Sequence, residues 1–450
     1  MTSKTPTYLP VETRIAAFAS RYGGGVEAVY AGILLLALTQ GPVLSIWLRS
    51  VQPGELVAER AIDSTYLFVQ VPAVALLARR LRPGVLAARP ALLVATLALF
   101  LALSTTWSVL RADTIVAATA LVATTAAGMY LAATFPLRRL LLITCVAMQP
   151  GLLASELAVR HKWFAAVDDK HSWAGIYFNR NSLGPPAAIG LLTALLLGIA
   201  AFRRRTAHRP LVLVVLLAVV VYDGRLLYLS GSATSFTLVA VATFVFAVGT
   251  VAANRFGDYC TPRLAHRIGA LYIAVLCALA VLVYGLRDQV SSWLHRPAGF
   301  DGRTPYWDAS LRGFRVHPLR GWGWLAAWHA PDFKALVPEV LKTEIWSHSA
   351  YLDVALGGGI IAVLLLTAVL VYGFGNAAEV SITDRELGGW SLAVATGVAV
   401  ASTQESFMIG NHFLWALFVA ATVIRIQQTP LANPADTLLL EPGDQRGTTT

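Results

Sequence analysis

The sequence predicts an all-α protein that crosses a membrane about twelve times. Only 13% of its 450 residues are charged and 56% are hydrophobic, whereas soluble domains carry about 25% charged residues. A soluble chain of this length has too little interior to bury so many apolar side chains. The composition also excludes disordered, collagen-like and disulfide-scaffold chains. A bundle of membrane helices remains, because backbone polar groups in hydrocarbon must be hydrogen-bonded within a helix or a closed barrel.

Apolar runs of about twenty residues, the length that crosses the hydrocarbon core of a bilayer, locate the individual spans. They lie near residues 26–48, 61–78, 91–108, 114–135, 140–158, 185–202, 211–229, 232–253, 267–286, 349–374, 388–407 and 411–426. Four of the loops between spans are rich in arginine, namely 79–90, 136–139, 203–210 and 254–267. Cytoplasmic loops accumulate Lys and Arg. We therefore place these loops and both termini in the cytoplasm.

This topology divides the chain into five segments. They are a cytoplasmic N-terminal tail (1–25), nine transmembrane helices (26–286), a large extracytoplasmic loop (287–348), three transmembrane helices (349–426) and a cytoplasmic disordered tail (427–450). The large loop is far longer than an ordinary connector, and its many tryptophans argue against disorder. We expect it to contain short helices and to form a lid or a binding surface.

The net charge of +10 is explained by the cytoplasmic loops, so we expect the lipid bilayer as partner and no nucleic acid. The three cysteines, Cys145, Cys260 and Cys277, do not have the spacing of a metal site. His161, His171, Asp168 and Asp169 come nearest to a metal-binding set, but their spacing places no pair on one helix face. We therefore expect neither a metal nor another cofactor.

Several residues in the predicted outer loops have side chains suited to chemistry on an anion. A helical pattern begins near Gly302, with Pro305 in its first turn, and Trp307, Leu311, Phe314 and Leu319 mark an apolar side. On this helix Arg312 and Arg315 share a neighbouring side. His348 lies at the mouth of the tenth span, where histidine can accept a proton near neutral pH.

Two further features stand near the outer ends of spans. Asn181 and Ser182 are candidate helix caps before Pro185, and the adjacent Arg180 can face a phosphate. Asp353 is an ionisable group inside a span, which makes it a functional suspect, although its spacing from His348 does not place the two on one helix face.

Taken together, guanidinium groups, one histidine and an aromatic-rich lid indicate a site on the outer face. Guanidinium groups bind phosphates in a bidentate manner and stay charged. Tryptophans bury the apolar faces of sugar rings, and Trp307 and Trp324 are candidates for this role. The expected ligand is a glycan linked to a lipid diphosphate.

The motifs resemble the signature of the O-antigen ligase and O-antigen polymerase superfamily, and are most similar to its exopolysaccharide-polymerase branch. The resemblance covers roughly residues 100–375. The motif residues run Gly302-Arg303-Thr304…Trp307, His317-Pro318-Leu319-Arg320-Gly321-Trp322-Gly323 and His348-Ser349-Ala350-Tyr351-Leu352…Gly357-Gly358. Ser104-Thr105-Thr106-Trp107-Ser108 and the loop from Gly175 to Gly184 agree with two further family segments.

The resemblance implies metal-independent, inverting glycosyl transfer at the outer face of the bacterial cytoplasmic membrane, from a glycan carried on undecaprenyl diphosphate. It implies that Arg303 grips the diphosphate and that His348 is the general base. Family members carry a cation in an S-x-S-[RK]-T segment, where this chain has Ala233, and they usually have Asn after the histidine, where it has Ser349. Arg225 and Arg320 are candidate replacements for the missing cation.

The sequence leaves alternatives open. The acceptor is a glycan or a glycolipid, so polymerase and ligase are not distinguished, and a chain-length regulator or another envelope-assembly protein is a possible partner. Another type of polyprenyl-phosphate glycosyltransferase uses an acidic base in the first outer loop, where Glu55, Glu59 and Asp63 lie. A lipid-linked glycan transporter or flippase is the alternative that is not an enzyme.

Overall fold

The computed structural model describes residues 11–50, 56–80, 89–203, 207–256, 261–286, 289, 303–342, 346–384 and 386–424. Helices dominate this part of the chain, with loops and one isolated β-bridge between Val167 and Trp173. The all-α prediction is confirmed for these residues. The predicted tail after residue 426 lies outside them, as do Glu55 and part of the large loop.

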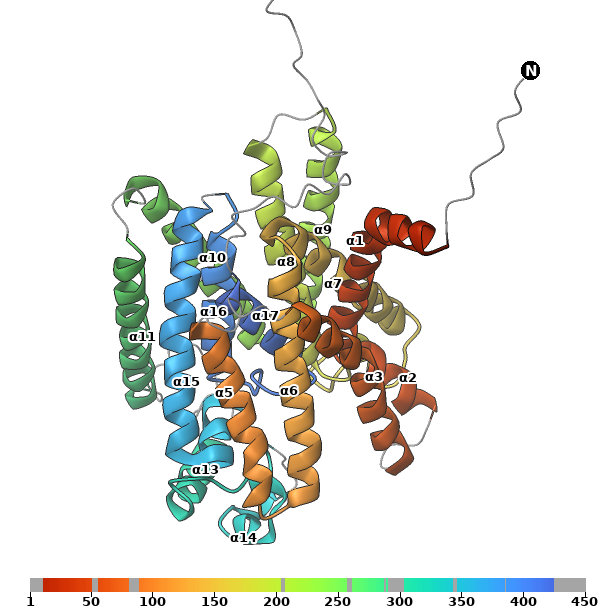
Figure 1. Cartoon of the computed structure of the whole chain (residues 1–450). Coiled ribbons are helices and arrows are strands. Elements are labelled where there is room, and N and C mark those ends of the chain that lie inside the picture. Colours follow the sequence, from red (N-terminus) through yellow and green to blue (C-terminus); the bar gives the residue numbers. More distant parts are fainter. Residues whose placement is uncertain are drawn as a thin grey trace, which may run out of the picture.

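The long helices form the bundle of Figure 1. They are α1 (Val11–Leu38), α2 (Gly41–Ser50), α3 (Leu56–Arg80), α5 (Arg89–Leu103), α6 (Arg111–Thr134), α7 (Leu137–Arg160), α8 (Arg180–Arg203), α9 (Arg209–Ser230), α10 (Ala233–Phe256), α11 (Pro262–Gly285), α15 (Ala350–Thr383), α16 (Gly389–Ala401) and α17 (Phe413–Val423). Helix α1 begins at Val11, inside the segment predicted as a tail. The described residues hold eight helices long and apolar enough to cross a membrane, or nine if the bent α1–α2 pair, with its 68° angle, is one span.

The prediction of a polytopic membrane protein is therefore confirmed, whereas the count of twelve membrane spans stays a prediction. Most predicted spans coincide with a long helix, including α11 at the span predicted over 267–286. The runs 388–407 and 411–426 instead form the short helices α16 and α17, of 13 and 11 residues. Because each residue of a helix adds only about 1.5 Å, neither helix crosses a bilayer alone.

The connection between α16 and α17 enters the bundle. Asn411 donates its backbone N–H to Thr124 Oγ1 at 2.8 Å, and its side chain accepts from Gln70 at 2.7 Å. Thr124 and Gln70 lie near the middle of α6 and α3. This connection is therefore anchored among the helices by hydrogen bonds to buried polar groups, which are costly to leave unmade in an apolar interior.

The described part of the large loop folds into short helices. Helix α13 (Thr304–Val316) begins close to Gly302, where the sequence predicts a helix start, and η4 (Ala327–His329), α14 (Pro331–Lys334) and η5 (Glu339–Leu341) follow it. Helix α13 buries Ala309, Ser310 and Gly313, while Leu311 and Leu319 of the predicted apolar side are 39% and 66% exposed. Close packing of Gly313 against Phe333 selects this face.

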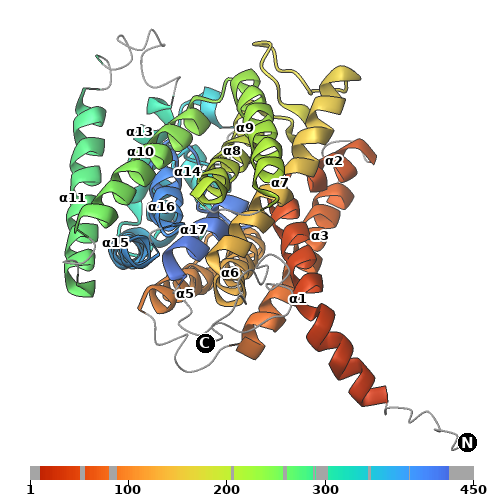
Figure 2. The ribbon, with the colours of Figure 1, turned by 90° about the horizontal axis from the view of Figure 1, so that it is seen from above.

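Helix α15 is broken near its start, where Gly359 has a φ of 63°. The segment around Pro318 fills the break, because its carbonyl accepts from the Ile360 N–H at 2.8 Å. Trp322 and Gly323 donate to the carbonyls of Leu356 and Gly357. The large loop is thereby fixed to the end of the bundle that is lowest in Figure 1, where α13 and α14 lie. Figure 2 shows α11 at the edge of the bundle, against α15.

Candidate functional site

A cavity of about 220 Å³ opens where four separate loops meet. Its lining residues come from the loop before α8 and its start (Lys170, Arg180, Asn181), the α9–α10 turn and the start of α10 (Gly231, Ala233, Thr234), the α13 region (Arg303, Tyr306) and the ends of α15 and α16 (His348, Glu405). These loops are the ones that the predicted topology places outside. Among the described lining residues, three cations face a single carboxylate. The cavity therefore favours an anionic ligand.

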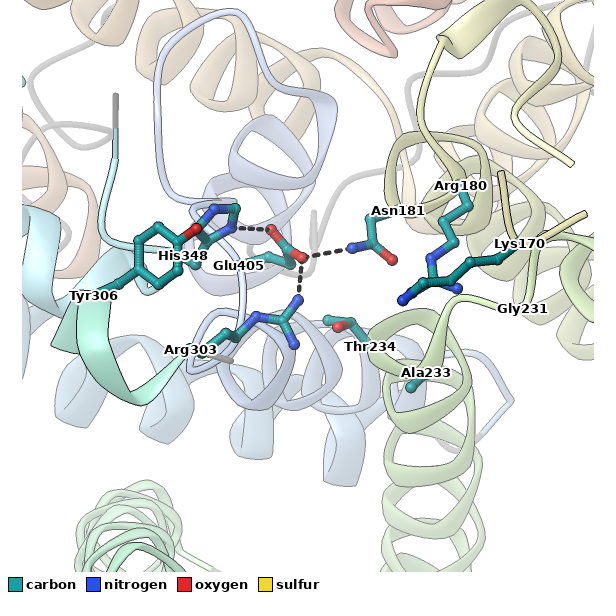
Figure 3. Close-up of a pocket in the computed structure, with 10 residues that line it drawn as sticks. All are labelled: Lys170, Arg180, Asn181, Gly231, Ala233, Thr234, Arg303, Tyr306, His348 and Glu405. Carbon is teal, nitrogen blue, oxygen red and sulfur yellow. Dashed lines mark hydrogen bonds and ion pairs between the residues drawn. The ribbon is translucent and has the colours of Figure 1, made fainter. Parts of the chain in front are cut away.

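Glu405 lies at the centre of this site, as Figure 3 shows. Its Oε1 accepts from Arg303 Nη2 at 2.5 Å and from Asn181 Nδ2 at 2.9 Å. Its Oε2 lies 3.4 Å from His348 Nδ1. The Glu405 side chain is only 11% exposed and that of Arg303 is 14% exposed. One carboxylate thus joins the two residues that the resemblance singled out.

The opposite wall of the cavity is also positive. Lys170 and Arg180 point toward the start of α10 beside Ala233 (Figure 3). Ser232 caps α10, since its Oγ accepts from the Ser235 N–H at 3.4 Å. The first N–H groups of a helix lack partners within the helix and carry partial positive charge. Two side chains and a helix end therefore stand where the family motif has one cation.

The loop before α8 is held in place by a buried tyrosine and an asparagine cap. Burial raises the pKa of the Tyr177 phenol above its ordinary value, so the hydroxyl keeps its proton and reaches Thr39 at 3.3 Å. Asn179, and not the predicted Asn181, caps the helix start, because its Oδ1 accepts from the Asn181 N–H at 2.7 Å. The Asn181 side chain is thereby left to bind Glu405.

His348 is held in an unusual backbone conformation with a φ of 50°. A non-glycine residue with positive φ carries strain that the surrounding structure must offset, and such residues cluster at functional sites. The preceding Ser347 donates its N–H to Asp353 Oδ1 at 2.9 Å. The rings of Tyr306 and Trp346 lie nearly perpendicular to the imidazole, at centroid distances of 5.0 and 6.2 Å. The ring therefore has one defined orientation.

Comparison with known families adds one finding. Residues 220–367 match the family model described as O-antigen ligase. This region of the chain is similar to O-antigen ligases. The match covers about a third of the sequence and includes Ala233, Arg303 and His348, so the resemblance to the superfamily is confirmed, although its exopolysaccharide branch is not distinguished. A search among curated proteins finds no match.

The cavity joins the matched region to parts of the chain outside it. Lys170, Arg180 and Asn181 precede the matched residues and Glu405 follows them. Of the predicted site residues, Arg303, His348, Arg180 and Asn181 are brought together here.

The other predicted site residues lie outside the described cavity lining. Arg225 pairs with Glu156 at 3.1 Å and covers the Trp173 ring at 5.2 Å. The guanidinium of Arg320 lies 5.8 Å from the Trp107 ring centroid. Arg312 and Arg315 are exposed on α13, Trp307 on the same helix is half-buried, and Trp324 is fully buried in the core. Neither predicted replacement for the cation at Ala233 therefore stands next to it.

Sequence reasoning missed Glu405, Lys170, Tyr306 and Thr234. Glu405 had a usable signal, because it is an ionisable residue at the end of an apolar run, and such residues are functional suspects. Lys170 had a weaker signal, because the loop 159–184 carries four cations although the predicted topology places it outside. Thr234 follows Ala233 in the S-x-S-[RK]-T segment and Tyr306 lies inside the motif that begins at Gly302, but neither residue type reveals a role in binding by itself.

Proposed function

We propose that the protein is a membrane glycosyltransferase of the ligase or polymerase type. It transfers a glycan from a polyprenyl diphosphate, such as undecaprenyl diphosphate, to an acceptor hydroxyl at the outer face of the bacterial cytoplasmic membrane. The observation that carries this proposal is the cavity itself, where an imidazole and three cations converge at one end of a polytopic helical bundle. The O-antigen ligase match over residues 220–367 supports the class of reaction.

On the donor side, the diphosphate occupies the positive half of the cavity. Arg303 binds it from one wall, while Lys170, Arg180 and the start of α10 bind it from the other. Guanidinium groups form paired, charge-assisted hydrogen bonds with phosphate oxygens. As the bond between the sugar C1 and the phosphate oxygen breaks, this fixed positive charge stabilises the leaving diphosphate. One such donor contributes about 10²–10³ in rate.

On the acceptor side, His348 accepts the proton. The acceptor hydroxyl oxygen attacks C1 from the face opposite the diphosphate, which inverts the configuration, and its proton passes to the imidazole. A positioned general base contributes about 10²–10⁴ in rate. The half-exposed Trp346 beside His348 offers an aromatic face to the acceptor sugar. No step of this scheme requires a metal ion or another cofactor.

The proposal is tested by reconstituting the purified protein in liposomes with a polyprenyl-diphosphate-linked glycan and an acceptor. We expect a new covalent glycan product from the wild type, and none above background from His348→Ala. A flippase instead changes only which side of the liposome holds the donor. If replacement of Glu55 or Asp63 abolishes product while His348→Ala keeps it, the acidic-base alternative is correct.

Ligase and polymerase activity are separated in cells by deleting the gene and sizing the surface glycans. Loss of long chains indicates a polymerase, and accumulation of long chains still attached to lipid indicates a ligase. If neither glycan length nor attachment changes, the proposed function is wrong.

A further inference from the structure

We propose that Glu405 is a positioning residue that sets which nitrogen of His348 is protonated and holds Arg303 until the donor replaces it. The inference rests on the proposed function and assigns a role to a residue outside the matched family region. Its basis is the single carboxylate that contacts Arg303, His348 and Asn181.

The contact with His348 determines the proton position. A carboxylate only accepts hydrogen bonds, so the His348 nitrogen that faces it, Nδ1, must carry the proton. In a neutral imidazole the other nitrogen, Nε2, then holds the lone pair. A buried carboxylate that fixes a histidine in its base-competent tautomer is a known device of nucleophilic enzymes. Glu405 would thus prepare His348 to accept a hydroxyl proton at Nε2.

The segments that carry His348 and Glu405 are both hydrogen-bonded to the buried carboxylate of Asp353. Asp353, on the first turn of α15, accepts from the N–H of Ser347 and from the hydroxyl of Ser406. These residues adjoin His348 and Glu405 in the sequence. The Ala350 N–H also donates to the Ser402 carbonyl at 3.0 Å. The distance between the carboxylate and the imidazole is therefore set by the fold and not by two independent loops.

Before the glycan donor binds, the Glu405 carboxylate takes the place of the donor's diphosphate on Arg303. Arg303 is paired with Glu405 Oε1, so the charge of this guanidinium is balanced before any diphosphate arrives. A diphosphate carries more charge and more acceptor oxygens than a carboxylate, so it displaces Oε1 from Arg303. The Oε2 contact with His348 does not need to change in this exchange.

Replacing Glu405 by glutamine distinguishes this role from simple support of the fold. Arg303 and Asn181 both donate hydrogen bonds to Oε1. The amide oxygen of the glutamine will therefore occupy the Oε1 position, because only the oxygen can accept them. The amide NH₂ then faces Nδ1 of His348 and forces it to act as an acceptor, which moves the proton to Nε2. Glu405→Gln therefore imposes the wrong tautomer, whereas Glu405→Ala imposes none.

We expect Glu405→Gln to lower kcat by about 10²-fold or more, because a base in the wrong tautomer cannot accept the proton. Its KM for the donor should fall about 5-fold, since the ion pair competing for Arg303 is weakened. Glu405→Ala should retain a higher kcat than Glu405→Gln. A purely structural role predicts the reverse order, because glutamine has the shape of glutamate, and it predicts a raised KM. The exposed Glu339, which pairs with Lys342, provides the control Glu339→Gln, with unchanged kcat and KM.

The tautomer is measured directly by ¹⁵N NMR of histidine-labelled protein without substrate, with His348→Gln used to assign the signal. We expect protonated Nδ1 in the wild type and protonated Nε2 in Glu405→Gln. The inference is overturned if the two spectra agree, if Glu405→Gln keeps the wild-type kcat, or if Glu405→Ala is the less active variant. If the wild type itself forms no glycan product, the proposed function fails, and the NMR comparison still decides the tautomer.

Discussion

At the scale of single residues, Arg303 is more than a positive charge. Its guanidinium faces the cavity from the start of α13 and already donates to a carboxylate oxygen. A planar fork of N–H donors matches two phosphate oxygens, whereas the ammonium of lysine is a compact point charge. We therefore expect Arg303→Lys to lower kcat by about 10²-fold, as measured with saturating donor in the reconstituted transfer assay. Wild-type kcat in this variant would contradict the diphosphate clamp.

Lys170 supplies positive charge where the family motif places it at position 233. We expect Lys170→Ala to raise the donor KM by about tenfold, because one phosphate contact is lost from the cavity wall. The same substitution combined with Ala233→Arg should recover most of the loss, since both positions line this wall. Lys334, at the end of α14, provides the control Lys334→Ala with no change in KM. Failure of Ala233→Arg to improve on Lys170→Ala would show that the two positions serve different ligand groups.

The sequence predicted part of this site, and the reason lies in how each residue is positioned. His348 and Arg303 belong to motifs whose residue types reveal their chemistry, and Arg180 and Asn181 stand in a recognisable loop. Glu405 joins the site only because the α16–α17 connection enters the bundle and is anchored there through Asn411. That path depends on packing among distant helices and is invisible in local hydrophobicity.

At the scale of elements, the break in α15 connects the large loop to the bundle. A methyl group at Gly359 would lie 2.4 Å from the backbone of Leu319, and its φ of 63° is strained for other residues. We expect Gly359→Ala to lower the melting temperature of the purified protein and to reduce transfer, because steric overlap and backbone strain together cost about 1–3 kcal/mol or more.

The control is Gly198→Ala in α8, where no neighbouring atom lies within 4 Å. This variant should be neutral or stabilising by up to about 1 kcal/mol. Equal stability of the two variants would mean that the α15 break tolerates a side chain.

Hydrophobic run lengths predicted most helices but not their interruptions. The apolar stretches around α6, α7 and α8 are long and continuous, so the hydrophobic length alone located them. The bend between α1 and α2 and the break at Gly359 involve tertiary contacts instead, since Gly41 packs closely on Tyr177 and the Pro318 carbonyl accepts from the Ile360 N–H. Apolar composition is the same on either side of such a break, and a count of apolar residues merges the pieces into one span.

At the scale of the whole molecule, positively charged residues gather at both ends of the helical bundle. Loops such as 136–139 and 203–210 carry arginine as cytoplasmic loops do. The loops at the other end also carry cations, namely Lys170, Arg180 and Arg303, but these converge on the cavity. In the proposed topology these cations lie on the outer face, against the usual asymmetry, and they suit an anionic ligand. The proposed topology therefore depends on the cavity end of the bundle facing outward.

Cysteine labelling tests this orientation in spheroplasts of cells that produce a variant with Cys145, Cys260 and Cys277 replaced by alanine. Glu339→Cys lies on η5, on the cavity side, and its native side chain is 87% exposed. His208→Cys lies on the exposed turn between α8 and α9, at the opposite end of these antiparallel helices. We expect a membrane-impermeant maleimide to label Glu339→Cys in intact spheroplasts, and His208→Cys only after the membrane is permeabilised, because the charged reagent does not cross the hydrocarbon core. The reverse pattern would place the cavity in the cytoplasm, where an acceptor outside the cell has no access to His348, and the proposed outer-face reaction would then be untenable.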